Sequence, residues 1–228
     1  MGHVISNIDW SVVANDGGLS VLVVDSQGRV IYINTAAARI YTRRAAKETI
    51  GQRLTDFLPG PAASERLEHI RHVIAAGESL IFRDLWSGIA LRCTIRRVDN
   101  VSNGPETGPA AIVVGTPEAA LLEENVAEPT ARSIEAKHID LGPLAGLTSS
   151  ELKVLALIGE GLSNAEIAAR LHRAVKTVES HRAALTDKTG SSSRVQLGIM
   201  ARRAGLSRRL GPSISNGDNV VSGTRIPA

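Results

Sequence analysis

The chain has 228 residues, of which 43% are hydrophobic and 21% charged, a composition that excludes a protein disordered throughout and, at this length, predicts two modest domains. The net charge of +3 conceals a basic block, because residues 148–210 hold eleven Lys and Arg against five Asp and Glu. Such a block is typical of a nucleic-acid partner or of a solvated basic face. The single cysteine excludes an internal disulfide and every metal site built on two thiolates, and the absence of a long apolar run or a signal peptide predicts a cytoplasmic protein with no membrane partner.

After an N-terminal flanking segment, residues 1–18, two β-branched runs at 19–25 and 30–34 are separated by a Gly-containing turn, which predicts a hairpin. Ala-rich and charged stretches follow from 36 to 76, and they predict short helices and then one longer helix at 62–76 that ends at Gly77. Three more strands are expected at 79–86, 88–98 and 110–115. The turn formers at 99–109 predict a mobile loop between the last two.

The run VLVVDS also looks like the first strand of a phospho-accepting receiver domain. Phosphoryl transfer to an aspartate needs a Mg²⁺ site built from several acidic oxygens. Asp25 stands alone and is followed by a hairpin turn, so we reject the receiver interpretation and expect Asp25 to be a turn residue.

Strands on both sides of a helical insert predict an α+β domain, an antiparallel sheet with helices on one face, over residues 19–115. The stretch VIYINTAAARIYTRRAAKETIGQRLTDFLP resembles the PAS sensor fold, and the resemblance implies sensing or dimerisation. Haem-binding PAS domains keep their axial ligand on the long helix, where His69 and His72 fall here. The charged neighbours Glu68 and Arg71 favour a solvated face for both histidines over a haem site. Cys93 lies in a predicted strand rather than in the helix motif of flavin photosensors. The cofactor, if any, stays unknown.

Residues 116–146 form an acidic linker, in which Thr116 is placed to cap a short helix that runs to Ala127. A helix of this length serves either as a connector between protomers or as a solvated linker helix. After Leu210 the sequence loses all periodicity, and residues 211–228 are expected to be a disordered tail.

Helix signals are densest from Leu147 onward. Thr148 with Glu151, and Ser163 with Glu166, form capping boxes that predict helices at 149–160 and 164–171. A connection of three or four residues then leads to a third periodic segment, so the second and third helices form a helix-turn-helix.

At 100° per residue the third helix has a core side and an opposite, exposed face. The expected core side holds Val175, Val178, His181 and Leu185, and the exposed face holds Lys176, Glu179, Ser180, Ala183 and Asp187. Such a face enters the major groove of duplex DNA, where carboxylate, hydroxyl and methyl groups contact base edges and basic groups contact phosphates. The DNA-contacting residues predicted from this helix are Lys176, Thr177, Glu179, Ser180, Arg182 and Ala183.

The motifs LTSSELKVLALIGEGLSNAEIAARL and KTVESHRAAL, with Lys188, Gly190, Ser193-Arg194 and Leu197, resemble the LuxR-type DNA-binding domain, and TVESHR is similar to its FixJ-like branch. The resemblance covers about residues 147–206 and implies an all-α domain of four helices, which we expect to span residues 147–210. The third is its recognition helix, and the fourth, at 194–204, is commonly used for dimerisation. Arg173 and Ala174 depart from the family pattern, because they leave the recognition helix without a polar N-cap.

These features predict a sequence-specific transcriptional regulator that is not an enzyme, binds double-stranded DNA as a homodimer, and has RNA polymerase or a signalling protein as a further partner. The alternative is an interaction module whose degraded helix-turn-helix pairs with a related regulator. Two surfaces are candidates for dimerisation: an N-terminal one with Val4, Ile5, Ile8 and Trp10, and the fourth helix with Val195, Ile199 and Met200.

Overall fold

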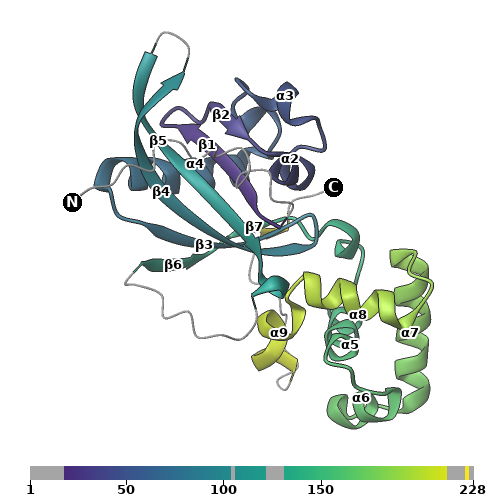
Figure 1. The fold of residues 1–228 in the computed structure, drawn as a ribbon. Coiled ribbons are helices and arrows are strands. Elements are labelled where there is room, and N and C mark those ends of the chain that lie inside the picture. The colour runs from purple at the N-terminus through teal and green to yellow at the C-terminus, as the bar shows by residue number, and fades with distance from the viewer. Residues whose placement is uncertain (1–17, 104–105, 122–130, 215–223, 226–228) are drawn as a thin grey trace. The chain divides into compact units, whose positions relative to one another are not determined.

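The computed structural model describes residues 18–103, 106–121, 131–214 and 224–225 (Figure 1). Contacts divide the chain into two compact units. The first comprises Met1–Arg83, Arg92–Pro117 and Asn125–Glu135, and the second comprises Asp84–Leu91, Glu118–Glu124 and Ala136–Ala228. The predicted N-terminal dimerisation surface lies outside the described residues.

The first unit is built on a sheet of six strands in the order β2-β1-β5-β4-β3-β6. The strands are β1 (Ser20–Asp25), β2 (Val30–Ile33), β3 (Leu80–Trp86), β4 (Ile89–Asn103), β5 (Glu106–Pro117) and β6 (Arg132–Glu135). The hairpin predicted at its start is present: β1 pairs antiparallel with β2, with Leu22 opposite Ile33, and on its other side β1 pairs antiparallel with β5. The predicted α+β class of the N-terminal region is confirmed.

One expectation about this sheet is wrong. The loop predicted at 99–109 is largely strand, because β4 and β5 are neighbours in the sheet and continue beyond the apolar positions into the turn formers. Asn100 accommodates a φ of 57° within β4, a left-handed conformation that asparagine adopts more readily than most residues. A further strand, β6, lies beyond the range predicted for the sheet and pairs parallel with β3.

Helices α2 (Thr35–Tyr41), α3 (Ala46–Thr49) and α4 (Gly60–Ala76) and the 3₁₀ helix η1 (Leu54–Asp56) occupy the predicted helical insert. Asn34 fixes the entry to α2. Its side-chain oxygen accepts hydrogen bonds from the amides of Ala37 at 2.8 Å and Val21 at 3.1 Å, and its amide donates to the Leu19 carbonyl at 2.8 Å. The buried amide is thus satisfied on both sides and joins β1 to α2.

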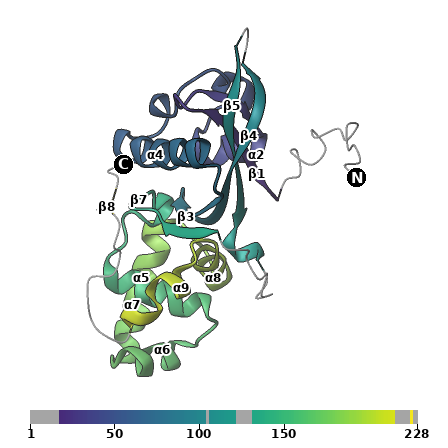
Figure 2. The ribbon, with the colours of Figure 1, turned by 90° about the vertical axis from the view of Figure 1, so that its left-hand side faces the viewer.

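The long helix α4 lies against the sheet (Figure 2). The buried guanidinium of Arg66 stands over the Phe82 ring, 5.4 Å from its centroid, and the His69 ring lies 5.3 Å from the same ring. His69 is therefore half-buried against an aromatic side chain, whereas His72 is exposed. The two histidines suggested as haem ligands thus differ in their exposure to solvent. Among the described residues there is no group of three or more His, Cys, Asp or Glu side chains that could hold a metal ion.

The predicted linker is more structured than its composition indicated. β5 extends to Pro117, so the predicted helix does not begin at Thr116, and Glu118–Ala120 form the 3₁₀ helix η2 instead. The remainder of that predicted helix lies outside the described residues. Further along the predicted linker lie β6, β7 (His138–Ile139) and the 3₁₀ helix η3 (Gly142–Leu144). The residues of this segment have a low intrinsic propensity for strand or helix. Pairing with neighbouring strands stabilises β6 and β7, and burial of Leu144 stabilises η3.

The second unit contains five helices among its described residues: α5 (Ser149–Gly159), α6 (Asn164–Leu171), α7 (Val175–Thr189), α8 (Arg194–Arg203) and α9 (Leu206–Ile214). The first four correspond to the four predicted helices. α9 was not predicted, and it extends into the segment expected to be a disordered tail, as does β8 (Thr224–Arg225), which pairs with β7. Leu206 and Leu210 are buried, so tertiary packing stabilises a helix that continues into a segment without sequence periodicity. No helix in the described part of the chain is long and apolar enough to cross a membrane.

Candidate nucleic-acid interface

Two capping boxes fix the start of α5 and α6. The Thr148 hydroxyl accepts from the Glu151 amide, and the Glu151 carboxylate accepts in return from the Thr148 amide at 2.7 Å. Ser163 and Glu166 make the same reciprocal pair, and these hydrogen bonds with Ser163 lower the pKa of Glu166. Each capping box provides hydrogen-bond acceptors for amides that otherwise lack partners at a helix start. Because this signal is local, the starts of both helices could be predicted correctly from the sequence.

The turn between α6 and α7 is tight and exposed. His172 ends α6 in a left-handed conformation with a φ of 51°, and its amide donates to carbonyls of the last turn. Ala174 is the N-cap of α7 and offers no side-chain hydrogen bond, as the sequence indicated. The first turn of α7 therefore receives no side-chain cap from Ala174, and the side chains of Arg173 and Lys176 beside it are exposed.

Only part of the predicted core side of α7 is buried. Val178 and Leu185 are fully buried, and His181 is half-buried. Val175 is 43% exposed, so its assignment to the core is wrong. Every residue from 172 to 177 is exposed, so Val175 is exposed together with the rest of the turn in which it lies.

All of the residues predicted to contact DNA project from α7 on its exposed side. We call this set the reading face: Lys176, Thr177, Glu179, Ser180, Arg182 and Ala183. Asp187 is exposed as well, one turn further along. At 100° per residue Lys176, Ser180 and Ala183 lie near the centre of the reading face, and Thr177 and Arg182 lie at its two edges.

Within the reading face the polar groups are only loosely held. Lys176 Nζ lies 3.8 Å from Glu179 Oε2, and the two side chains are 89% and 47% exposed. An exposed pair of this kind contributes at most about 1 kcal/mol, so either partner exchanges it readily for a phosphate or a base. The Ser180 hydroxyl donates to the Lys176 carbonyl at 3.0 Å, which leaves its oxygen able to accept from a base amino group.

The far end of α7 is anchored to the start of α5. Lys188 Nζ lies 2.8 Å from Glu151 Oε2, and the Glu151 side chain is 6% exposed. Burial by itself raises the pKa of Glu151, but the hydrogen bonds from Lys188 and Thr148 and the charge of Lys188 outweigh burial and leave this pKa below its usual value. The carboxylate thus serves two elements, as the N3 partner of the α5 cap and as the ion-pair partner of α7.

Arg194, at the start of α8, holds the α5–α6 connection. Its guanidinium donates to the Leu162 carbonyl and, at 3.3 Å, to the Asn164 side-chain oxygen. Arg194 and Lys188 belong to the LuxR-type motifs of the sequence, but the motifs alone do not predict the partners of these two side chains. Their partners lie 32 and 37 positions away in the chain, so no local spacing revealed them.

Comparisons with known proteins assign both regions. Residues 145–201 match the family of bacterial regulatory proteins, luxR family, and residues 17–107 match a PAS fold family. The predicted resemblance is therefore confirmed: the chain carries a LuxR-family helix-turn-helix domain and a PAS-fold domain. The LuxR match contains α5, α6, α7 and most of α8, and it ends before α9.

Curated relatives share the helix-turn-helix region. The DNA-binding transcriptional activator DevR/DosR of Mycobacterium tuberculosis is 41% identical over 66 residues, which are 29% of this chain and 30% of that protein. The transcriptional regulatory protein LiaR of Bacillus subtilis is 39% identical over 61 residues, which are 27% of this chain and 29% of that protein. The chain thus spans less than a third of the length of either relative.

Among solved structures, this chain is similar to VqmA of Vibrio cholerae, described as a LuxR-type receptor. One VqmA dimer structure is 20% identical, with a TM-score of 0.42, and the match covers 92% of this chain and 93% of that one. A VqmA–ligand–DNA complex is 21% identical, with a TM-score of 0.45, and the match covers 90% of both chains.

Proposed function

We propose that this protein is a transcriptional regulator whose reading face on α7 binds duplex DNA sequence-specifically. The observation that carries the proposal is the exposure of the complete reading face on a helix whose opposite side is packed through Val178 and Leu185. A helix presented in this way fits the major groove, which is about 12 Å wide. The names of the curated relatives, an activator and a transcriptional regulatory protein, support this assignment.

The reading face divides by chemistry into groups for the DNA backbone and groups for the bases. Lys176 and Arg182 carry charges suited to phosphates, and exposed Arg173 adds a third beside the uncapped helix start. Glu179 is suited to accept from a cytosine amino group, Ser180 to several bases, and the Ala183 methyl to a thymine methyl. Asp187 repels phosphate where it approaches the backbone, which keeps the affinity modest.

We further propose that the regulator acts as a homodimer. A single recognition helix covers few base pairs, so useful specificity requires two half-sites roughly one helical turn apart. Val195 and Ile199 are the large apolar side chains of α8 that stay exposed, at 70% and 45%, and their spacing of four residues places them on one side of the helix. We call Val195 and Ile199 the pairing face. An exposed apolar pair on one helix side favours association with a second copy.

In this proposal the PAS-fold domain senses a signal. The protein acts in the cytoplasm and catalyses no reaction of its own. The signal stays unassigned.

Enrichment of bound sequences from a random duplex pool tests the proposed function. We expect the full chain to enrich a motif with two related half-sites. A pool that stays random after several rounds would favour the alternative, an interaction module that pairs with a related regulator and does not read DNA.

A further inference from the structure

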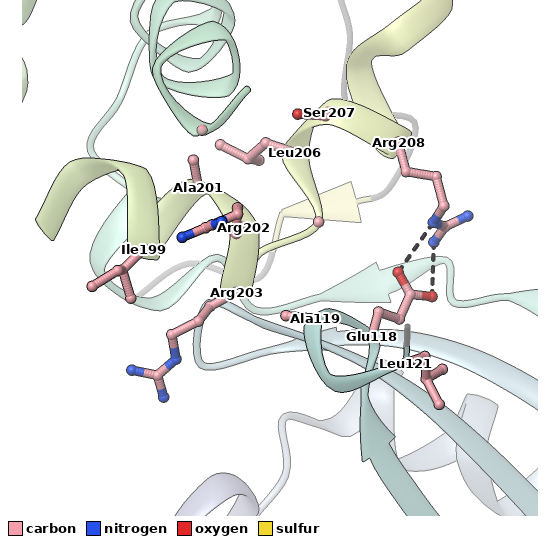
Figure 3. Close-up of a pocket in the computed structure, with 12 residues that line it drawn as sticks. Glu118, Ala119, Leu121, Ile199, Ala201, Arg202, Arg203, Leu206, Ser207 and Arg208 are labelled. Carbon is pink, nitrogen blue, oxygen red and sulfur yellow. Dashed lines mark hydrogen bonds and ion pairs between the residues drawn. The ribbon is translucent and has the colours of Figure 1, made fainter. Parts of the chain in front are cut away.

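The helix that lies beyond the LuxR match is tied to the segment that follows β5. Arg208 on α9 donates from Nε to Glu118 Oε2 at 3.0 Å and from a terminal nitrogen to Glu118 Oε1 at 3.1 Å, and Figure 3 shows this two-point pairing. The Glu118 side chain is only 11% exposed and the Arg208 side chain 45%. We call this ion pair the latch. A bidentate pair with one partner nearly buried holds its geometry better than a surface pair.

The backbone around the latch is shaped for close approach. Gly205, between α8 and α9, has a φ of 59°, and a Cβ at this position would lie 3.3 Å from Glu118 Oε2 and 3.1 Å from the Ala90 Cβ. A glycine therefore lets the α8–α9 turn reach the carboxylate. Two further bonds fix α9: Arg209 donates to the Asp84 carbonyl at 3.0 Å, and the Ser207 hydroxyl donates to the Ala156 carbonyl at 3.4 Å.

The latch places η2 next to the pairing face. A hollow of about 610 Å³ is lined by Glu118 and Ala119 of η2, by Leu121, and by residues of α8 and α9 that include Ile199. Figure 3 shows Ile199 and Leu121 among the side chains that border it. Leu121 is 37% exposed and Ile199 45%, so the hollow is open on its apolar rim. Packed helices lie about 8–10 Å apart, so a second α8 that docked on Ile199 would compete for space with η2 and Leu121.

From these contacts we infer that the latch is an autoinhibitory contact, which holds η2 beside α8 and limits pairing of two copies through the pairing face. The inference rests on the proposed function and names its regulation. Glu118 directly follows Pro117, the last residue of β5, so the latch joins α9 to the chain segment that leaves this strand. Opening of the latch frees α9 and η2, favours the dimer, and strengthens binding to DNA that has two half-sites.

The test uses full-length variants. Glu118→Gln removes the ion pair, and Glu160→Gln removes the same charge from an exposed carboxylate at the end of α5 and serves as the control. The double variant Glu118→Arg with Arg208→Glu restores an ion pair with its charges reversed. Dimerisation is measured by sedimentation velocity without DNA, and affinity is measured on a duplex with two half-sites and on a duplex with one.

We expect Glu118→Gln to lower the dimer dissociation constant and to raise the ratio of two-site to one-site affinity by about three- to fivefold, the range that one ion pair of this exposure supports. Glu160→Gln leaves both quantities unchanged, and the charge-reversed pair returns both toward the wild-type values. Equal values for Glu118→Gln and Glu160→Gln would overturn the latch. If no variant binds DNA but Glu118→Gln still dimerises more tightly, the proposed function fails while the latch stands.

Discussion

Lys188 Nζ and Glu151 Oε2 lie 2.8 Å apart and join the last turn of the recognition helix α7 to the capped start of α5. Because Glu151 is buried and also accepts from the Thr148 amide, one carboxylate holds both the beginning of α5 and the far end of α7. The orientation of the reading face therefore depends on a residue that does not belong to it.

Glu151→Gln is expected to destabilise the helical domain by about 2 kcal/mol, because the amide keeps an acceptor for Thr148 but loses the charged bond to Lys188. The pKa of Glu151 is lowered by folding, so its contribution is present above the unfolded pKa of about 4.3 and disappears as the pH falls through the lower folded value. Urea unfolding at neutral pH and at successively lower pH measures the difference from wild type. A difference that does not shrink below about pH 4 would contradict this role.

Two valines of α7 have opposite environments, so we expect their replacement by alanine to have different effects on the unfolding free energy. Val178 is 1% exposed and Val175 is 43% exposed. Val178→Ala removes buried methyl groups and leaves a cavity, and should cost about 2 kcal/mol of unfolding free energy. Val175→Ala should stay within about 0.5 kcal/mol of wild type. Thermal or urea unfolding of both variants checks the burial pattern, and similar losses would place Val175 in the core after all.

A cap added to the recognition helix should stabilise it. Ala174 has the extended backbone of an N-cap, with a φ of −71° and a ψ of 146°, but no side-chain acceptor. Ala174→Ser supplies a side-chain acceptor for the amides of the first turn and should raise the unfolding free energy by roughly 0.5–1 kcal/mol. Ala183→Ser, in the exposed middle of the same helix, is the control and should be neutral or slightly destabilising. No difference between the two serines would mean that the first turn is not formed as described.

Lys176 and Glu179 should have different effects on DNA binding although they pair with each other. Lys176→Ala should weaken binding to all sequences alike and lower the salt slope by about one, because one phosphate contact is lost. Glu179→Ala should change base preference at one position, with a discrimination of about 1–3 kcal/mol. Binding of each variant to duplexes that differ at single positions separates the two roles, and a uniform loss for Glu179→Ala would remove it from the set of base-reading residues.

The helices that sequence analysis located well are those with local signals. The capping boxes at Thr148 and Ser163 define α5 and α6, whose predicted and observed ranges differ by at most one residue. α9 was missed because the sequence after Leu210 has no hydrophobic period, whereas the helix depends on burial of Leu206 and Leu210. In α9, tertiary packing therefore outweighs a low intrinsic helix propensity.

In the candidate site, too, features that depend on local sequence could be predicted, whereas contacts between residues far apart in the chain could not. The 3.6-residue period identified the exposed side of α7, and exposure of the reading face follows from it. The ion pairs of Lys188 with Glu151 and of Arg208 with Glu118 join residues far apart in the chain, so only the fold reveals them. Strand β6 depends likewise on its partner β3, since its own four residues carry little strand signal.

We expect α7 to read duplex DNA, and a salt titration of binding checks this claim. Fluorescence anisotropy of the full chain is measured on the enriched duplex and on a scrambled duplex of equal length, from about 50 to 200 mM salt. We expect affinity to fall steeply with salt on both duplexes, while the enriched duplex keeps an advantage of at least about a thousandfold. Binding that is absent, or that is equal on the two duplexes at every salt concentration, would contradict the claim.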